Sequence, residues 1–160
     1  MILRIIFVFL LFFTFITNSY SAGSSSGTTK SYYDRAAKLI TAAKKYESKG
    51  KDKKAKKRYE RALKFLIKSN DEKPNQADTL NYLGFATRKL GDYKKGEEYY
   101  LLGLKIDPNH KGINEYLGEL YVVTNRINLA KERLNVLKSC NCEEYEELKE
   151  IIEGKKQSKY

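Results

Sequence analysis

The sequence predicts an all-α fold, a helical solenoid built from one repeated helix–turn–helix unit. Residues 77–109 have the pattern of two short amphipathic helices, joined by a tight turn and closed by a helix stop. The pair Leu83-Gly84 recurs 34 residues later as Leu117-Gly118. Self-similarity at this period is the signature of stacked helical repeats.

Each special position of the central unit has a mechanical reason. Gly84 is small because the two helices of the unit are expected to cross closely there. Gly91 permits the positive φ that ends the first helix, and Asp92 can cap the start of the second. Asp107-Pro108 ends that second helix, because the residue before a proline disfavours the α region.

The segment before the central unit repeats the same pattern 41 residues upstream. Ala43 takes the place of Gly84, and Gly50 again permits a turn with positive φ. The seven additional residues in this step lie around 70–76, where the second helix is expected to continue before Pro74. The chain therefore carries about three units.

The central unit resembles the tetratricopeptide repeat, a helix–turn–helix unit of about 34 residues. The resemblance rests on Leu83-Gly84, on Gly-Asp-Tyr at 91–93, on the tyrosines at 99–100 and on Asp-Pro-Asn at 107–109. It implies a right-handed superhelical solenoid of about three units with a C-terminal capping helix. It also implies a protein that works by binding.

The chain departs from the family pattern in several places. Ile67 and Cys142 stand where the family has a proline, and Gly96 and Gly103 replace its usual alanines. Each glycine costs about 1 kcal/mol in helix propensity. The C-terminal part, LGELY followed by CEEYEELKEII, is also similar to a group of small exported bacterial repeat proteins.

The expected organisation is a leader, a linker, a repeat domain and a tail. The signal peptide is expected at 1–21, a flexible Gly/Ser-rich linker at 22–30, the repeat domain at 31–153 and a basic tail at 154–160. Within the repeat domain, the units lie at 36–69, 77–110 and 111–144, and the capping helix lies at 143–153. In the capping helix the apolar face that covers the last unit is formed by Tyr145, Leu148, Ile151 and Ile152. Asn141 with Glu144 predicts a capping-box-like start.

A hydrophobic N-terminal stretch predicts export. Residues 5–17 form an uncharged apolar run behind Arg4, and Ser19 and Ser21 suit cleavage before Ala22. The alternative is an uncleaved membrane anchor, although spanning a bilayer takes about 20 apolar residues. We therefore expect a periplasmic or secreted protein that touches a membrane only if the signal peptide is retained.

The resemblance also implies a groove lined by the first helix of each unit. The candidate partner-binding residues are Lys44, Asp78, Asn81, Phe85, Arg88, Glu115 and Glu119, with Ile40, Glu47 and Val122 beside them. This lining is mixed in charge, and it does not reproduce the Lys/Asn/Arg set with which some chaperone-binding relatives clamp a C-terminal carboxylate. The alternative is an ordinary solvated helix face. Three units make a short groove, which suits an extended peptide or one partner helix.

The formal net charge is +11, and seven of the ten residues at 49–58 are basic. This stretch predicts either a solvated helix face or a contact with an anionic partner such as a lipid headgroup, a cell-wall polymer or an acidic protein. The candidate polyanion-binding residues are Lys51, Lys53, Lys54, Lys57 and Arg58. Export disfavours nucleic acid as the partner. The acidic helix at 143–153 could contact this stretch head to tail at low salt, and we expect a monomer at physiological salt.

No catalytic constellation can be assembled from the sequence. Cys140 and Cys142 are the only cysteines, and in an exported chain they predict a structural disulfide or inert thiols, with a redox pair or a Cu(I) site as the alternative. His110 is the only histidine and is expected to be a solvated loop residue. There is no glycine-rich phosphate loop. The sequence therefore predicts no enzyme, no cofactor and no metal, and a protein or peptide partner whose identity it does not give.

Overall fold

The computed structural model describes residues 31–158, which form seven α-helices and no strand. The expected signal peptide and linker, together with the last two residues of the basic tail, lie outside the described residues. The helices are α1 (Tyr32–Glu47), α2 (Asp52–Glu72), α3 (Ala77–Lys89), α4 (Tyr93–Ile106), α5 (Lys111–Val123), α6 (Ile127–Leu137) and α7 (Glu143–Ile152). Within residues 31–158, no helix combines the length and the apolar character needed to cross a bilayer.

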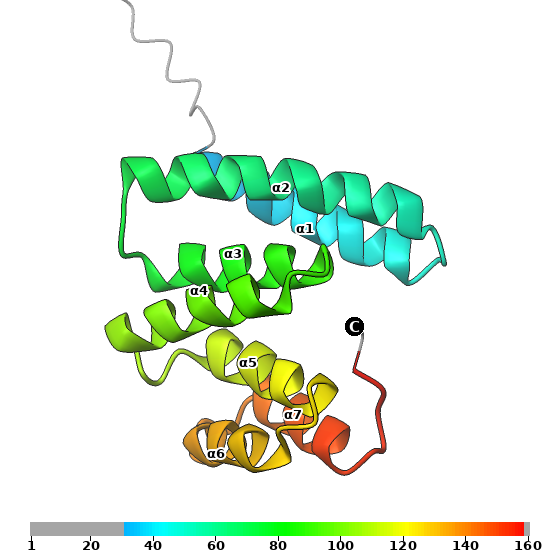
Figure 1. The fold of residues 1–160 in the computed structure, drawn as a ribbon, viewed down its shortest axis with the longest axis vertical. Helices are drawn as coiled ribbons and strands as arrows, with labels where there is room; N and C mark the ends of the chain where they lie inside the picture. The colour runs from blue at the N-terminus through cyan, green and yellow to red at the C-terminus, as the bar shows by residue number, and fades with distance from the viewer. Residues whose placement is uncertain (1–30, 159–160) are drawn as a thin grey trace, which may run out of the picture.

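The helices stack as successive antiparallel pairs, as Figure 1 shows from α1 and α2 at the top to α6 and α7 at the bottom. α1 packs on α2, α3 on α4 and α5 on α6, while α2·α3 and α4·α5 join one pair to the next. α1 also contacts α3, and α3 contacts α5, so the first helices form one continuous row. The predicted all-α solenoid is confirmed.

α7 does more than cover the last pair. It packs against both α5 and α6, which is how the first helix of a fourth unit would sit. Leu148 and Ile151 supply its buried face. A Cβ placed on Gly118 of α5 would lie 2.5 Å from Leu148 Cδ2, so the absent side chain lets the two helices approach closely. The row of first helices is therefore α1, α3, α5 and α7.

The turns and helix ends of the central unit follow the sequence pattern. Gly91 has φ +98°, and the Asp92 carboxylate accepts a hydrogen bond from the backbone N–H of Lys95 at 2.9 Å. α4 ends at Ile106, directly before Asp107-Pro108. The turn glycine, the N-cap and the stop are therefore confirmed.

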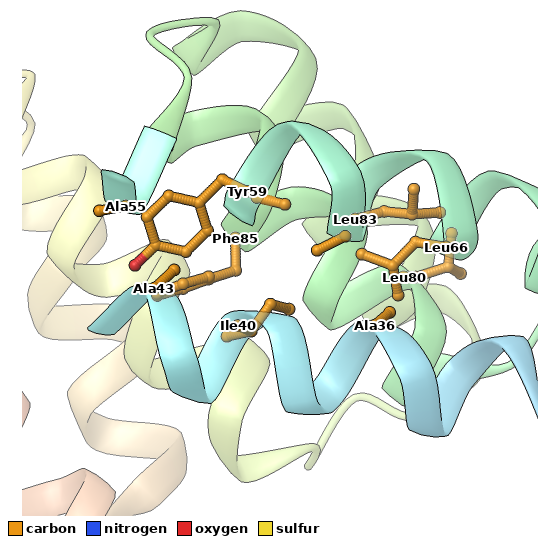
Figure 2. Packing of buried hydrophobic residues seen from close by; sticks show 11 residues of the cluster. Ala36, Ile40, Ala43, Ala55, Tyr59, Leu66, Leu80, Leu83 and Phe85 are labelled. Atoms are coloured by element: carbon orange, nitrogen blue, oxygen red, sulfur yellow. The ribbon is translucent and has the colours of Figure 1, made fainter. Parts of the chain in front are cut away.

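The first core cluster lies between α1, α2 and α3 (Figure 2). Ile40, Tyr59 and Phe85 are almost fully buried there, and the rings of Tyr59 and Phe85 meet edge to face with centroids 5.8 Å apart. The Tyr59 hydroxyl donates a hydrogen bond to Glu47 at 2.9 Å, which satisfies its polar end. This cluster fixes the C-terminal end of α1 against α3.

The helix-weakening glycines of α4 have packing roles. A Cβ on Gly96 would lie 3.1 Å from the backbone oxygen of Gly84, and one on Gly103 would overlap the side chain of Ile113. Both contacts cross to a neighbouring helix, α3 in the first case and α5 in the second. The cost in helix propensity is therefore offset by closer packing between helices.

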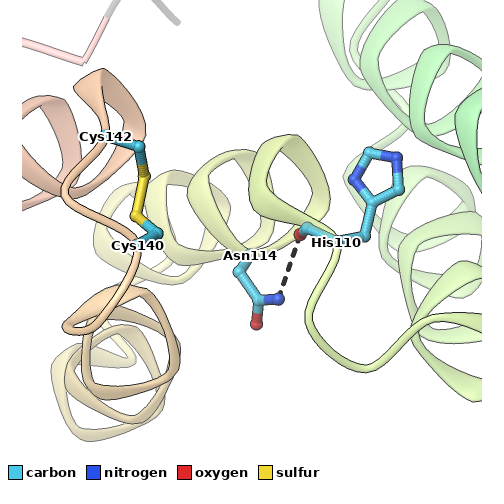
Figure 3. The surroundings of a disulfide bond; sticks show 4 residues. All are labelled: His110, Asn114, Cys140 and Cys142. Carbon is cyan, nitrogen blue, oxygen red and sulfur yellow. Dashed lines mark hydrogen bonds between the residues drawn. A yellow bond between two sulfur atoms is a disulfide. The ribbon is translucent and has the colours of Figure 1, made fainter.

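The predicted capping box at the start of α7 is wrong. Cys142 occupies the N-cap position with an extended backbone and no side-chain cap, while Asn141 has φ +45°. The reason is the bond between Cys140 and Cys142, which closes the loop around Asn141 and places it one residue before the cap (Figure 3). The α-carbons of the two cysteines lie 5.2 Å apart.

Candidate binding groove

A groove of about 860 Å³ crosses the row of first helices. Every helix of the row contributes to it, and the lining residues are Lys44, Lys45, Glu47, Ser48, Phe85, Lys89, Glu115, Tyr116, Glu119, Glu143, Glu144 and Glu147. We call Lys44, Lys45 and Lys89 the basic wall, and we call Glu115, Glu119, Glu143, Glu144 and Glu147 the acidic wall. The basic wall comes from α1 and α3, and the acidic wall comes from α5 and α7.

The basic wall is held by contacts inside the protein. Lys89 Nζ lies 2.6 Å from a carboxylate oxygen of Glu47. Lys44 Nζ donates a hydrogen bond to the Tyr116 hydroxyl at 2.9 Å and lies 4.6 Å from the centroid of the Phe85 ring. A cation over a ring face is stabilised by the ring quadrupole. Two of the three lysines are therefore already engaged.

The acidic wall is not balanced in the same way. Burial raises the pKa of Glu115 to about 8, helped by repulsion from Glu119, Glu144 and Glu147 and opposed by attraction to Lys44. Within residues 31–158 no basic side chain forms an ion pair with Glu115. At neutral pH this carboxyl therefore keeps its proton in most molecules.

Arg88 lies beneath the groove and not on its surface, so its predicted place in the lining is wrong. Its side chain is only 1% exposed, and its guanidinium lies 3.4 Å from Glu119 and donates a hydrogen bond to the backbone oxygen of Tyr116. Both contacts tie α3 to α5. Arg88 is therefore a structural residue of the groove floor, because it neutralises a carboxylate that is itself nearly buried.

The groove continues into a second hollow of about 870 Å³ at the N-terminal ends of α3 and α5, and Glu115, Tyr116 and Glu144 line both. The predicted residues Asp78 and Asn81 line this second hollow. Asn81 is 7% exposed, and its amide oxygen has no hydrogen-bond partner in the described part of the chain. Of the seven predicted groove residues, four line the groove, two line the second hollow, and Arg88 is buried beneath the groove.

His110 is not the solvated loop residue that the sequence suggested. Its side chain is 14% exposed, with Nδ1 accepting the backbone N–H of Ile113 and Nε2 lying 3.1 Å from Asp78. His110 thus caps the N-terminus of α5 and joins it to α3. Behind it, Asn114 donates hydrogen bonds to the backbone oxygens of Pro108 and His110, the second of which Figure 3 shows. The histidine has a structural role here.

None of residues 49–58 lines the groove, and the stretch covers the turn after α1 and the start of α2. Lys51, Lys53, Lys54 and Lys57 are exposed and Arg58 is half-buried, with its guanidinium 5.9 Å from the centroid of the Tyr46 ring. The aromatic contact packs the stem of Arg58 against α1. The lysines present a charged face to solvent that shares no residue with the groove.

The two cysteines form a disulfide in the link between α6 and α7, outside the groove. Among residues 31–158 no three His, Cys, Asp or Glu side chains are grouped so that they could hold a metal ion. The structure thus gives Cys140 and Cys142 a position in which they fix the loop before α7.

The sequence did not point to α7 as part of the groove. Glu143, Glu144 and Glu147 recur at helical spacing beside the buried Leu148 and Ile151, and this spacing is the signal that could have found them. Tyr116 was also missed, because a tyrosine beside a core leucine is usually part of the core. Its ring lies 4.9 Å from that of Phe85 and forms the floor between the walls.

No protein-family model matches the chain, and no curated protein matches it. Solved structures do. The Yersinia enterocolitica type III secretion translocator chaperone SycD matches with a TM-score of 0.54 at 19% identity, over 76% of this chain and 88% of that one. The first tetratricopeptide-repeat domain of Spaghetti (RPAP3), bound to the HSP90 peptide SRMEEVD, matches with a TM-score of 0.53 at 20% identity, over 76% and 94%.

The first such domain of human RPAP3 matches with a TM-score of 0.53 at 18% identity, over 78% of this chain and 97% of that one. At these identities the likeness concerns the fold, and it agrees with the stacked pairs and the row of first helices. The chain therefore has the tetratricopeptide-repeat fold, a helical solenoid of the kind that its central unit resembles.

Proposed function

We propose that the chain is an exported scaffold or adaptor that binds another protein, or a peptide of it, through the groove. The observation that supports this most directly is that four helices from separate parts of the chain, α1, α3, α5 and α7, line one continuous surface. A solved domain of the same fold is bound to a peptide, and another belongs to a secretion chaperone. The proposal assigns no catalytic step to the chain.

The export part of the proposal rests on the N-terminal sequence and on the disulfide. Residues 5–17 and the small residues after them have the pattern of a cleavable leader. The disulfide between Cys140 and Cys142 suits an oxidising compartment, which favours the periplasm or the exterior. Mass measurement of the protein recovered from its host tests this part, with a mass that begins at Ala22 as the expected result.

Site-specific photo-crosslinking in the native host tests the binding surface. A photo-reactive phenylalanine analogue replaces Lys45, which lines the groove, or Leu102, which is 46% exposed on α4 and lies outside it. We expect a discrete crosslinked species from the Lys45 position and none from the Leu102 position. Crosslinks from Leu102 alone would show that partners use another face.

A second candidate function is the binding of an envelope polyanion or lipid headgroup through the 49–58 face. It is favoured by one observation, the solvent exposure of Lys51, Lys53, Lys54 and Lys57 along the start of α2. Vesicle co-sedimentation discriminates it. Binding to vesicles with anionic headgroups that weakens steeply between low and physiological salt would support it, since such contacts are screened.

A further inference from the structure

We propose that the acidic wall binds an extended, lysine- or arginine-bearing segment of the partner protein. This inference rests on the proposed function, because it names the chemistry of the partner at the same groove. Three observations support it: the charge of the wall, a lysine that already contacts it, and a polar group in the adjoining hollow.

The charge of the groove is unequal on its two sides. Of the acidic wall, Glu119 is paired with Arg88 and Glu147 with Lys156, whereas Glu115, Glu143 and Glu144 have no ion pair within residues 31–158. On the basic wall, Lys89 is paired with Glu47. Glu143 and Glu144 therefore leave the acidic wall with unpaired negative charge, although the whole chain carries +11. A cationic segment is the complement of this wall.

The chain itself seats a lysine on this wall. After α7, Gly154 has φ +70°, and the backbone N–H of Lys155 donates to the oxygen of Glu150 at 2.9 Å, which closes a Schellman turn. The turn reverses the chain, and in Figure 1 the red segment beyond α7 runs back upward. Lys156 then forms an ion pair with Glu147, a member of the acidic wall. A lysine side chain thus already occupies one carboxylate of the acidic wall.

The adjoining hollow offers a partner for a peptide backbone. The Asn81 side chain is buried there, and its amide oxygen accepts no hydrogen bond in the described residues. Leaving such an acceptor unsatisfied is costly, and a peptide N–H is a suitable donor. The surface is therefore suited to an extended chain and less to an isolated small cation.

Peptide titration tests the proposal. The probe is a fluorescent, end-blocked peptide of sequence GKKQSKY, the chain's own residues 154–160, with GQQQSQY as the uncharged control. Because the proposal places the probe against the side chains of Glu144 and Glu147, E144Q/E147Q should weaken binding at least about fivefold. The matched control is E132Q/E146Q, which removes the same charge from exposed positions outside the groove. We expect it to leave the affinity within about twofold.

A pair of neighbouring lysines supplies a test of opposite sign. K156Q frees Glu147 of the acidic wall, whereas K155Q frees Glu153, which does not line the groove. The two variants have the same net charge. We therefore expect K156Q to bind the GKKQSKY probe about two- to fivefold more tightly than K155Q, because it removes an internal competitor.

The release of protons on peptide binding is a second measurement, which reports on Glu115 in a way that the affinity does not. A cation beside Glu115 favours its ionised form, so binding near pH 7 should release protons, measured by titration calorimetry in two buffers of different ionisation enthalpy. E115Q should lose most of this release. The groups that face Glu115 across the site are Lys44, Asp78, Tyr116, Glu119, Glu144, Glu147 and Lys156.

Several outcomes overturn the proposal. One is equal weakening by E144Q/E147Q and E132Q/E146Q, and another is a probe that binds no better than GQQQSQY. Displacement of the probe by spermidine at equal concentration would show that the wall takes free polyamines and not a peptide. A groove that crosslinks its partner while failing these tests would leave the proposed function standing and refute only the basic chemistry. Circular dichroism melting confirms that each variant is folded.

Discussion

The two walls of the groove carry opposite charge and differ in how that charge is satisfied. On the basic wall, Lys89 contacts Glu47, and Lys44 contacts a tyrosine hydroxyl and an aromatic ring. On the acidic wall, Glu115 has no ion pair within residues 31–158, and its pKa is raised to about 8. The difference shows that an ionisable residue in the lining suggests a ligand only when no group of opposite charge in the protein is paired with it.

Two carboxylates of one helix make the same comparison at closer range. Glu115 and Glu119 lie one turn apart on α5, and Arg88 reaches only the second. Glu119 is therefore part of the structure, whereas Glu115 remains available for a cation from outside. The predictions that follow disturb this arrangement, from the largest expected effect to the smallest.

Removing the buried partner of Glu119 should have the largest effect. Arg88→Ala takes away a guanidinium that is 1% exposed, and we expect the free energy of unfolding to fall by about 3–5 kcal/mol. Urea denaturation measures it. Arg61→Ala on the exposed side of α2 is the control and should change stability by less than about 0.5 kcal/mol. A loss below about 1 kcal/mol for Arg88→Ala would mean that the acidic wall does not need its buried cation.

Changing the spacing of α5 and α7 should have the next largest effect. Gly118→Val places a side chain where Leu148 now packs, so we expect a loss of about 2–3 kcal/mol. Leu148→Ala alone should also destabilise, because it opens a cavity. In the double variant the two changes should compensate in part, which a thermodynamic cycle detects. Strict additivity would show that the two residues do not share one space.

The raised pKa of Glu115 predicts a pH dependence of stability. The folded state holds this proton more tightly than the unfolded chain, whose carboxyl has a pKa near about 4.5, so the contribution is full below that value. It is lost as the pH rises through about 8, with a slope of at most about 1.4 kcal/mol per pH unit. Glu115→Gln should flatten the curve between these values. Chemical denaturation across pH 4.5 to 9 checks it, and a wild-type curve that rises in this window would contradict the assignment.

Self-association should give the smallest effect. The lysines of 49–58 are exposed on α2, while the glutamates of α7 face the groove, and one of them is engaged by Lys156. Ion pairs between molecules are each worth about 0–1 kcal/mol and are screened at about 0.15 M salt. Sedimentation should therefore show a monomer at that salt and weak association only well below it. A dimer that persists at high salt would point to an apolar interface.

The local structure could be predicted from the sequence because each turn carries its own signal. Gly91 with Asp92 and Asp107 with Pro108 fix helix ends by chain geometry alone. Helix α7 begins at Glu143 as predicted, but the predicted cap of Asn141 with Glu144 was wrong, because the loop closed by the disulfide leaves Cys142 at the N-cap position. The two cysteines indicated the disulfide, but the helix-capping pattern alone does not show how such a bond places the residues of the loop.

The groove could be predicted only in part, because its lining depends on contacts between distant residues. Spacing places Arg88 on the groove side of α3, but only the packing of α5 shows that the side chain is buried against Glu119. In the same way, α7 was expected to act as a cover, and its packing against α5 turns its glutamates into a wall. The periodicity of a helix gives its faces, and the neighbouring helices decide what each face meets.

The central claim is that the acidic wall is electrostatically incomplete until a basic segment binds. Carbon-13 NMR of the glutamate side-chain carboxyls tests it directly, with the Glu115 signal assigned by its loss in Glu115→Gln. We expect a titration midpoint near about 8 in the free protein and a lower midpoint with saturating GKKQSKY peptide. A midpoint that the peptide does not move, or one near about 4.5 in the free protein, would contradict the account.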